Sequence, residues 1–284
     1  MSIKIQDYFR FIKFSHTVFA LPFALIGFSL AYFQQKPDLI ILLYVILCMV
    51  FARSAAMGFN RYLDRAIDEK NPRTKKREIP TGKISPKAAL IFVIIMSALF
   101  VAATFFINRL VFWLSFVALA VVLGYSYTKR FTSMSHFILG LGLSLAPIGA
   151  YLTVIPRFDL IPILYSFLVL TWVSGFDVIY SLQDYEFDKK EGLNSIPVIM
   201  GKKGALKLSV FLHLLSFATI VVIGSISSVG WLYWVGSAIF SALLLYQHLI
   251  VKPDDLSKVN LAFGTTNGIA SVVFSIFVIA DIFL

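Results

Sequence analysis

Long apolar runs recur along almost the whole of this 284-residue chain, and they constrain its fold more than any other feature. A helix that crosses a bilayer needs about 20 mostly apolar residues. None of the runs alternates every second residue, as the strands of a membrane barrel do. The sequence therefore predicts an all-α, polytopic membrane protein, a single membrane domain over residues 1–284. Its nine expected transmembrane helices are residues 15–34, 39–59, 87–107, 109–127, 134–155, 159–179, 205–224, 229–250 and 261–283.

Composition agrees with this class, because 59% of the residues are hydrophobic and only 14% are charged. The first apolar run, VFALPFALIGFSLAYF, lacks a small-residue cleavage site, so we expect it to remain as the first span. Cys48 lies in an apolar run and is expected to be a buried thiol. The histidines have no metal-ligand spacing and are expected to be packing or interfacial residues. They are His16, His136, His213 and His248.

The net charge of +10 predicts an orientation in the membrane rather than a nucleic-acid partner. Lys and Arg collect on cytoplasmic loops. If the N-terminus is cytoplasmic, 21 of the 25 Lys and Arg residues lie on that side. Three lie outside, at Lys36, Arg109 and Arg157, and Arg53 lies within a span. We therefore expect a multi-pass protein of the cell (inner) membrane whose N-terminus is cytoplasmic.

The segment FARSAAMGFNRYLDRAIDEK places carboxylates at the cytoplasmic end of the second span. Asn60, Asp64 and Asp68 stand four residues apart, a spacing that puts their side chains on one face of a helix. Arg53 lies on the same face, and an Arg inside a span needs an internal partner. Like charges four residues apart destabilise a helix, so this spacing favours a bound cation.

A second acidic cluster lies in GFDVIYSLQDYEFDKKEG, where Asp177, Asp184 and Asp188 again share one helical face. Asp184 follows Asp64 by 120 residues (184 minus 64), and Asp188 follows Asp68 by the same interval (188 minus 68). Both clusters precede long loops that close on Gly-Lys segments, which indicates a weak internal duplication.

Oxygen ligands without Cys or His select a hard cation, and Mg²⁺ is usually shared between carboxylates and substrate phosphates. The sequence therefore predicts Mg²⁺ at Asn60, Asp64, Asp68, Asp184 and Asp188, holding a diphosphate at the cytoplasmic mouth of the bundle. An apolar bundle suits the greasy tail of an allylic isoprenyl diphosphate. The basic side chains expected to bind the substrate are Arg53, Arg65, Arg73, Arg77, Lys129 and Arg130, with Asn60 beside them.

These motifs resemble those of the UbiA superfamily of intramembrane aromatic prenyltransferases. RSAAMGFNRYLDRAID is similar to R-x6-N-x3-D-x3-D, and DVIYSLQDYEFD to D-x2-Y-x3-D-x3-D. RTKKREIPTG, YSYTKRFT and SIPVIMG resemble further family segments, so the likeness covers nearly the whole chain. Two positions depart from the family pattern. Arg61 stands where many members have Asp, and Glu78 stands where Pro usually follows the Arg.

The resemblance implies a central cavity with a cytoplasmic helical cap, and Mg²⁺-dependent transfer of a polyprenyl group to an aromatic acid. It makes Asp177, Tyr180 and Asp184 the candidate catalytic residues. Asp177 is expected to accept or orient the proton of the ring hydroxyl, and Tyr180 to support the allylic cation through its π face. The motifs look most like those of 4-hydroxybenzoate polyprenyltransferases of ubiquinone biosynthesis.

Two alternatives stay open. A relative that prenylates a naphthoate for menaquinone would carry almost the same motifs. An ion-coupled membrane transporter is the alternative of another class, but transporters place their ion sites near the bilayer midplane in broken helices. Both acidic clusters are expected at cytoplasmic helix ends, which favours the enzyme.

Overall fold

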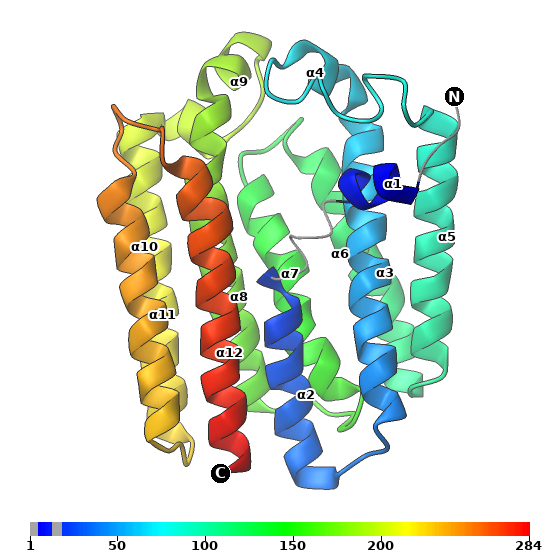
Figure 1. The fold of residues 1–284 in the computed structure, drawn as a ribbon, viewed down its shortest axis with the longest axis vertical. Coiled ribbons are helices and arrows are strands. Elements are labelled where there is room, and N and C mark those ends of the chain that lie inside the picture. The colour runs from blue at the N-terminus through cyan, green and yellow to red at the C-terminus, as the bar shows by residue number, and fades with distance from the viewer. Residues whose placement is uncertain (1–4, 13–18) are drawn as a thin grey trace.

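The computed structural model describes residues 5–12 and 19–284, and within them every extended element is a helix. The all-α class is therefore confirmed, because the only β pairing among these residues is an isolated bridge between Lys252 and Asp255. Figure 1 shows the helices in chain order. They are α1 (Ile5–Phe11), α2 (Leu21–Gln35), α3 (Ile40–Leu63), α4 (Arg65–Lys70), α5 (Pro86–Phe105), α6 (Arg109–Thr128), α7 (Ser135–Leu152), α8 (Leu160–Ser181), the 3₁₀ turn η2 (Leu182–Asp184), α9 (Tyr185–Glu191), α10 (Ile196–Ile226), α11 (Trp231–Ile250), the π-helix η3 (Leu261–Thr266) and α12 (Asn267–Phe283).

Eight helices within the described residues are long and apolar enough to cross a membrane, not the nine expected. The exception is α2, whose 15 residues span roughly 22 Å against a hydrocarbon core of about 30 Å. Pro22 stands in its first turn, where proline favours a helix start. The predicted span also included residues 15–18, which lie outside the described part of the chain.

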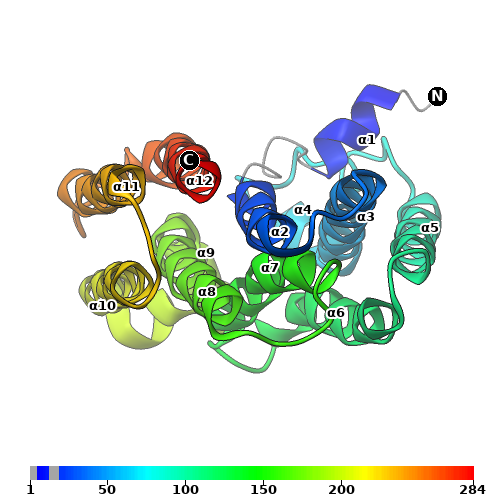
Figure 2. The ribbon, with the colours of Figure 1, turned by 90° about the horizontal axis from the view of Figure 1, so that it is seen from below.

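The long helices form one bundle, and α2 packs beside α7 in the half of the bundle away from the cap (Figures 1 and 2). The two helices approach closely because Gly27 has no side chain, and a Cβ there would overlap the carbonyl oxygen of Pro147. On one side of this pair α3, α5 and α6 contact one another, and on the other side α10 contacts α8 and α11 contacts α12. Several of the largest buried side chains, among them Trp172, Phe176 and Phe240, fill the second group.

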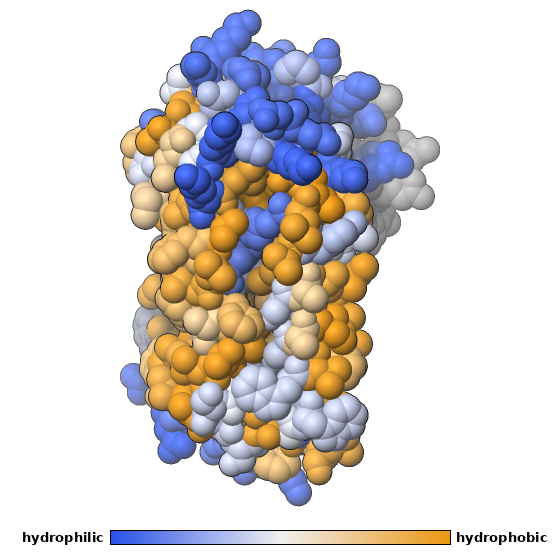
Figure 3. Space-filling view, turned by 90° about the vertical axis from the view of Figure 1, so that its left-hand side faces the viewer, coloured by the Kyte–Doolittle hydropathy of each residue, from blue (hydrophilic) through white to orange (hydrophobic). Residues whose placement is uncertain are grey.

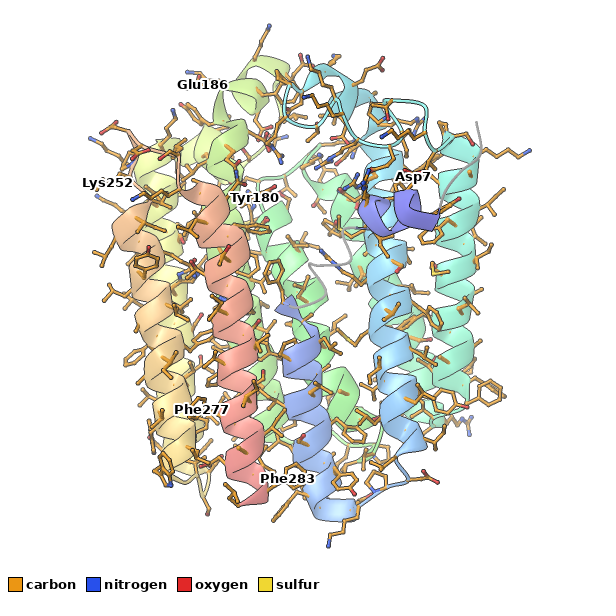
Figure 4. The ribbon with its side chains drawn as sticks, in the orientation of Figure 1. Asp7, Tyr180, Glu186, Lys252, Phe277 and Phe283 are labelled. Atoms are coloured by element: carbon orange, nitrogen blue, oxygen red, sulfur yellow. The ribbon has the colours of Figure 1, made fainter. Side chains whose placement is uncertain are left out.

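The outer surface of the bundle is apolar, as expected for a multi-pass membrane protein. Figure 3 shows a broad hydrophobic belt below a hydrophilic end. Large apolar side chains such as Trp231, Phe211 and Leu249 lie more than half exposed on α10 and α11. In a soluble protein so many exposed apolar side chains would be a liability, whereas here they face lipid. Figure 4 places Glu186 and Lys252 at the hydrophilic end, and Phe283 at the other end.

A helical cap covers the hydrophilic end, and this part of the expectation is confirmed (Figure 1). The two loops after the acidic motifs contain the short helices α4 and α9, which an ion pair of 2.7 Å between Lys70 and Glu191 joins. Asp64 and Asp184 have nearly the same backbone angles, with φ −84° and −97° and ψ 3° at both. The duplicated acidic motif therefore has the same local structure twice.

The two Gly-Lys segments are also alike, since Gly82 and Gly201 adopt φ of 71° and 69°. Glycine accommodates this left-handed region without strain. At Gly201 the backbone of α10 leaves helical geometry, so the helix has a short capping part and a long membrane part.

Candidate active site

The first acidic motif ends α3 with a buried, paired carboxylate. Asp64 is 1% exposed and accepts hydrogen bonds from Asn60 at 3.1 Å and Arg130 at 3.0 Å, and from Lys129. Asn60 and Asp64 meet because they are one turn apart at the end of the helix. A buried charge is costly unless it is paired, so the two cations from the end of α6 offset the burial of this carboxylate.

The second carboxylate of this motif, Asp68, lies on α4 and is 4% exposed. Both of its oxygens accept from Arg77 Nη1, at 2.9 and 2.8 Å. Thr74 Oγ1 also donates to the Asp68 carbonyl at 3.2 Å. The loop after α4 therefore folds back over its own acidic residues.

The loop after α4 also contacts the second acidic motif, at Asp184. Asp184 accepts from Asn71 Nδ2 at 3.0 Å and from Arg73 Nε at 2.9 Å. Arg73 Nη1 also donates to the Tyr180 hydroxyl at 2.9 Å, and its guanidinium lies over the Tyr180 ring. Burial alone would lower the pKa of Arg73, but its hydrogen bonds with Asp184 outweigh this and raise the pKa. The loop thus links the two acidic motifs through one cation.

These side chains line one cavity of about 250 Å³ beneath the cap. Figure 4 places Tyr180 at the cap end, below α9. Eleven of the thirteen predicted site residues line this cavity: Arg53, Asn60, Asp64, Asp68, Arg73, Arg77, Lys129, Asp177, Tyr180, Asp184 and Asp188.

Arg65 and Arg130 are the two predicted site residues that do not line it. Arg65 donates to the Tyr62 carbonyl at 2.7 Å and covers the Tyr62 ring. Arg130 supports Asp64 and donates to the carbonyls of Leu63 at 3.0 Å and Ser126 at 2.8 Å. Arg130 therefore acts through Asp64, and Arg65 faces away from the cavity.

An apolar cavity of about 240 Å³ lies next to the polar one, between α3, α6 and α7. Arg53, Tyr125 and Leu139 line both cavities, so they mark where the two meet. Arg53 Nε is buried and has no hydrogen-bond partner among the residues that the structure describes. A buried donor without a partner costs free energy, so this guanidinium is suited to a ligand.

The cavity residues that were not predicted from the sequence include Asn71, His136 and Phe263. Asn71 follows the acidic motif directly and binds Asp184, but its partner lies 113 residues away. Phe263 stacks on Tyr180 with ring centroids 4.0 Å apart.

The expectation that the histidines are packing residues holds for His213, which is buried against His248 at 2.8 Å between ring nitrogens. His136 is also buried, and in addition it lines the polar cavity, because α7 lies close against α8 and brings its ring to Asp177. His16 lies outside the described residues. Cys48 is half-buried and lines the apolar cavity.

The two departures from the family pattern are partners of each other. Arg61 and Glu78 form a buried ion pair, with exposed fractions of 4% and 9%. Arg61 Nη2 also reaches the Arg10 carbonyl at 3.4 Å, and its guanidinium lies over the Phe11 ring. The pair therefore fastens α1 and the loop after α4 to the end of α3, behind the acidic motif.

The residues around the polar cavity supply the oxygen donors that Mg²⁺ prefers. Within residues 5–12 and 19–284, however, no group of three or more Asp, Glu, His or Cys side chains is gathered closely enough to hold an ion. Asp64, Asp68 and Asp184 are each paired with a basic side chain instead. This arrangement fits an ion that takes few protein ligands and completes its shell with substrate phosphate oxygens, which is the usual mode for Mg²⁺.

The chain is similar in sequence to known prenyltransferases. A model of the UbiA prenyltransferase family matches residues 20–274. A 4-hydroxybenzoate octaprenyltransferase of Nitrosospira multiformis is 30% identical over 245 residues, which cover 85% of this chain and 83% of that protein. A protein of the same name from Aeromonas salmonicida is 29% identical and covers 84% of this chain and 82% of its own length.

Solved structures share the fold. The apo structure of a UbiA homolog from Aeropyrum pernix K1 has a TM-score of 0.80 and 29% sequence identity, covering 94% of this chain and 97% of its own. A UbiA homolog from Archaeoglobus fulgidus, bound to GPP and Mg²⁺, has a TM-score of 0.73 and 23% identity, covering 98% and 100%. At this identity the second comparison concerns the fold alone.

Proposed function

The chain belongs to the UbiA prenyltransferase family, and from this premise we propose that it transfers a polyprenyl group from an allylic polyprenyl diphosphate to a 4-hydroxybenzoate-type acid. The reaction would serve membrane quinone biosynthesis. Relatives that are 4-hydroxybenzoate octaprenyltransferases support this acceptor and a long prenyl donor. Membership of an enzyme family also removes the transporter alternative.

One observation carries the proposal: the polar cavity, lined by both acidic motifs, adjoins an apolar cavity, and Arg53 and Tyr125 line both. An allylic diphosphate has a strongly charged head and an apolar tail. The head suits the polar cavity beneath the cap, and the first part of the tail suits the apolar cavity between α3, α6 and α7. The reactive carbon of the donor would then lie near the boundary between the two.

The polar cavity is suited to bind Mg²⁺ and a diphosphate together. Asp64, Asp68, Asp184 and Asp188, with Asn60, would hold the metal. A UbiA homolog of the same fold is bound to GPP and Mg²⁺, which agrees with a metal and a prenyl diphosphate binding together. Bound Mg²⁺ would neutralise charge that develops on the departing diphosphate.

The basic side chains now paired with these carboxylates would turn toward the phosphates when the metal binds. They are Arg73, Arg77 and Lys129, each within ion-pair distance of one acidic residue. Asp64, Asp68 and Asp184 would each have a cationic partner with or without substrate, so neither state leaves these three charges unpaired. Donors placed where charge develops in the transition state lower the barrier.

The acceptor would lie with its carboxylate at Arg53 and its hydroxyl toward Asp177. Arg53 has a buried guanidinium nitrogen with no partner within the described part of the chain, at the boundary of the two cavities. Tyr180 and Phe263 stack on each other at the edge of the polar cavity and present an aromatic surface to an allylic cation. The apolar walls would keep water from that cation.

Purified protein with labelled geranyl diphosphate and MgCl₂ tests the function. We expect labelled prenyl-4-hydroxybenzoate and free diphosphate, with no product when either the acid or Mg²⁺ is omitted. Asp184→Asn is the inactive control. A parallel reaction with 1,4-dihydroxy-2-naphthoate separates the quinone alternatives. Product from the naphthoate alone would reassign the acceptor, and product from neither acid would refute the proposal.

A further inference from the structure

A buried histidine on α7 pairs with a partly buried aspartate on α8, one of the motif carboxylates. His136 Nδ1 lies 2.7 Å from Asp177 Oδ2, and both residues line the polar cavity. His136 is 5% exposed. Its second ring nitrogen, Nε2, is buried and has no hydrogen-bond partner among the described residues. The pair is therefore satisfied on one side only.

The chemistry of the two groups fixes which nitrogen carries the hydrogen. An ionised carboxylate only accepts hydrogen bonds, so a neutral His136 donates to Asp177 through Nδ1–H. This tautomer leaves a bare lone pair on Nε2. Buried polar atoms in native proteins nearly always have a partner, and an unpaired one is costly. The free acceptor atom is therefore suited to a donor that a ligand supplies.

Close packing of α7 on α8 holds the pair in place. Gly140 lies one turn after His136, and a Cβ there would overlap the Ser174 hydroxyl and come within 2.7 Å of the Leu170 carbonyl oxygen. Ser174 Oγ also donates to the His136 carbonyl at 3.3 Å. These contacts fix the backbone of His136 without using its ring. Among the described residues the ring is hydrogen-bonded only to Asp177, and its Nε2 stays free for a ligand donor.

We propose that His136 is the general base of the prenyl transfer, a role that rests on the function proposed above. Its Nε2 takes the hydroxyl proton of the phenolic acceptor, and Asp177 stabilises the imidazolium through Nδ1–H. A base oriented by a third group is a recurrent arrangement in enzymes. Asp177 is then a positioning residue that acts through His136, rather than the group that receives the proton.

The transfer breaks one carbon–oxygen bond and forms one carbon–carbon bond. The bond between the first prenyl carbon and the diphosphate oxygen breaks, and its electron pair leaves with the diphosphate. The ring carbon beside the hydroxyl forms the new bond with electrons of the ring, while the hydroxyl proton passes to His136 Nε2. The resulting dienone regains its aromatic ring when His136 returns its proton to the oxygen and then takes the proton from that carbon. One proton per turnover therefore passes from His136 to solvent, and the diphosphate is released as the second product.

The test compares His136→Gln and His136→Ala with wild type in the full-length, purified protein, using geranyl diphosphate, 4-hydroxybenzoate and MgCl₂. General bases contribute about 100-fold or more, so kcat is expected to fall by that factor. The KM for the donor should stay within about twofold, because the histidine acts on the acceptor. Added imidazole should restore part of the activity of His136→Ala. His248→Gln is the matched control. His248 lies on α11, contacts His213 of α10 and does not line the polar cavity, so this variant should keep wild-type kcat.

A wild-type measurement keeps the inference testable even where a variant does not fold. Diethyl pyrocarbonate modifies imidazole nitrogens, and mass spectrometry maps the products. We expect saturating 4-hydroxybenzoate to slow modification of His136 and to leave that of His248 unchanged. Equal modification of His136 with and without acceptor would overturn the role.

The remaining outcomes separate the base assignment from the proposed function. Wild-type kcat in His136→Gln, or a loss in His136→Ala that imidazole does not relieve, would overturn the base assignment while the proposed function stands. A wild-type protein without activity on any phenolic acid would overturn both together.

Discussion

At the scale of single residues, the sequence identified the charged groups but not their pairing. Asp64, Asp68 and Asp184 emerged from the spacing of their motifs, and all three line the polar cavity. The sequence did not show that each is held by a basic residue from another segment, because those contacts depend on how the cap folds. The same holds for Arg61 and Glu78, which stand 17 residues apart and meet only in the folded chain.

We predict that Arg61 and Glu78 stabilise the cap as a pair. Removing one partner of a buried ion pair leaves an uncompensated charge, which typically costs about 3–5 kcal/mol. Glu78→Leu should therefore lower the thermal midpoint markedly, whereas the double variant Arg61→Leu/Glu78→Leu should recover much of the loss. Thermal unfolding in detergent gives the coupling from a double-mutant cycle. Additive effects of the two changes would show that the ion pair is not the source of the stability.

The acidic residues should separate by function. We predict that Asp64→Asn loses binding of the prenyl diphosphate, because a ligand charge for Mg²⁺ disappears from a site that Lys129 also contacts. Asp177→Asn should bind the donor nearly as wild type does and lose kcat, because Asp177 contacts His136 rather than the cations. Calorimetric titration with geranyl diphosphate and Mg²⁺ measures the first effect, and steady-state kinetics the second. Equal donor affinity in the two variants would contradict this division.

At the scale of elements, hydropathy located the membrane helices but not their irregularities. The span expected at 205–224 is the membrane part of α10, which begins earlier, at Ile196. Lys202 and Lys203 hid its capping part from a reading based on apolar length. The π-helix η3 was not expected either, because its six residues, LAFGTT, contain no signal that separates a π-helix from the start of an ordinary membrane helix.

The irregular turn of η3 is stabilised by Asn267, whose side chain is held by two other helices. Its Nδ2 donates to the carbonyls of the π-helix at positions 262 and 263, at 3.0 and 3.1 Å. Its Oδ1 accepts from Trp172 on α8 at 2.9 Å and from Gln247 on α11 at 2.7 Å. These partners come from segments 95 and 20 residues away, so the network exists only once the helices have packed. Such buried polar networks specify a unique arrangement when all their members are satisfied. The π-helix in turn carries Phe263 to Tyr180, which links this network to the polar cavity.

Helix α7 should control the length of the prenyl donor. Gly149 lines the apolar cavity, and a Cβ there would meet no atom within 4 Å. We predict that Gly149→Phe fills this space and lowers kcat/KM for long donors, while dimethylallyl diphosphate remains a substrate. Competition between donors of different lengths measures the shift. Gly124→Phe on α6 is the control, because Gly124 also has open space but does not line the cavity. Equal effects on short and long donors would contradict this role of the cavity.

At the scale of the whole molecule, the charged groups of the site are concentrated at one end of the bundle. The cap end holds the acidic motifs and their basic partners, and the middle of the bundle is apolar on its outside (Figure 3). The sequence predicted this division because positive charges follow cytoplasmic loops. It did not reveal which helix faces line the cavities, since all the long helices are apolar and similar.

The charge distribution predicts that the cap faces the cytoplasm, and cysteine labelling in intact cells tests this. A Cys48→Ala background removes the native cysteine. Asp254, the first position for a new cysteine, lies in the connection after α11, two residues from Lys252, which Figure 4 places at the cap end. Gln35→Cys ends α2 at the opposite side of the bundle, and both positions are exposed. A maleimide that cannot cross the membrane should label Gln35→Cys in intact cells, and Asp254→Cys only after the membrane is opened. Moving a charged cap of this size across lipid is prohibitively costly, so one orientation should account for all the protein. The reverse labelling pattern would place the polar cavity on the outside and require the substrates to reach it from there.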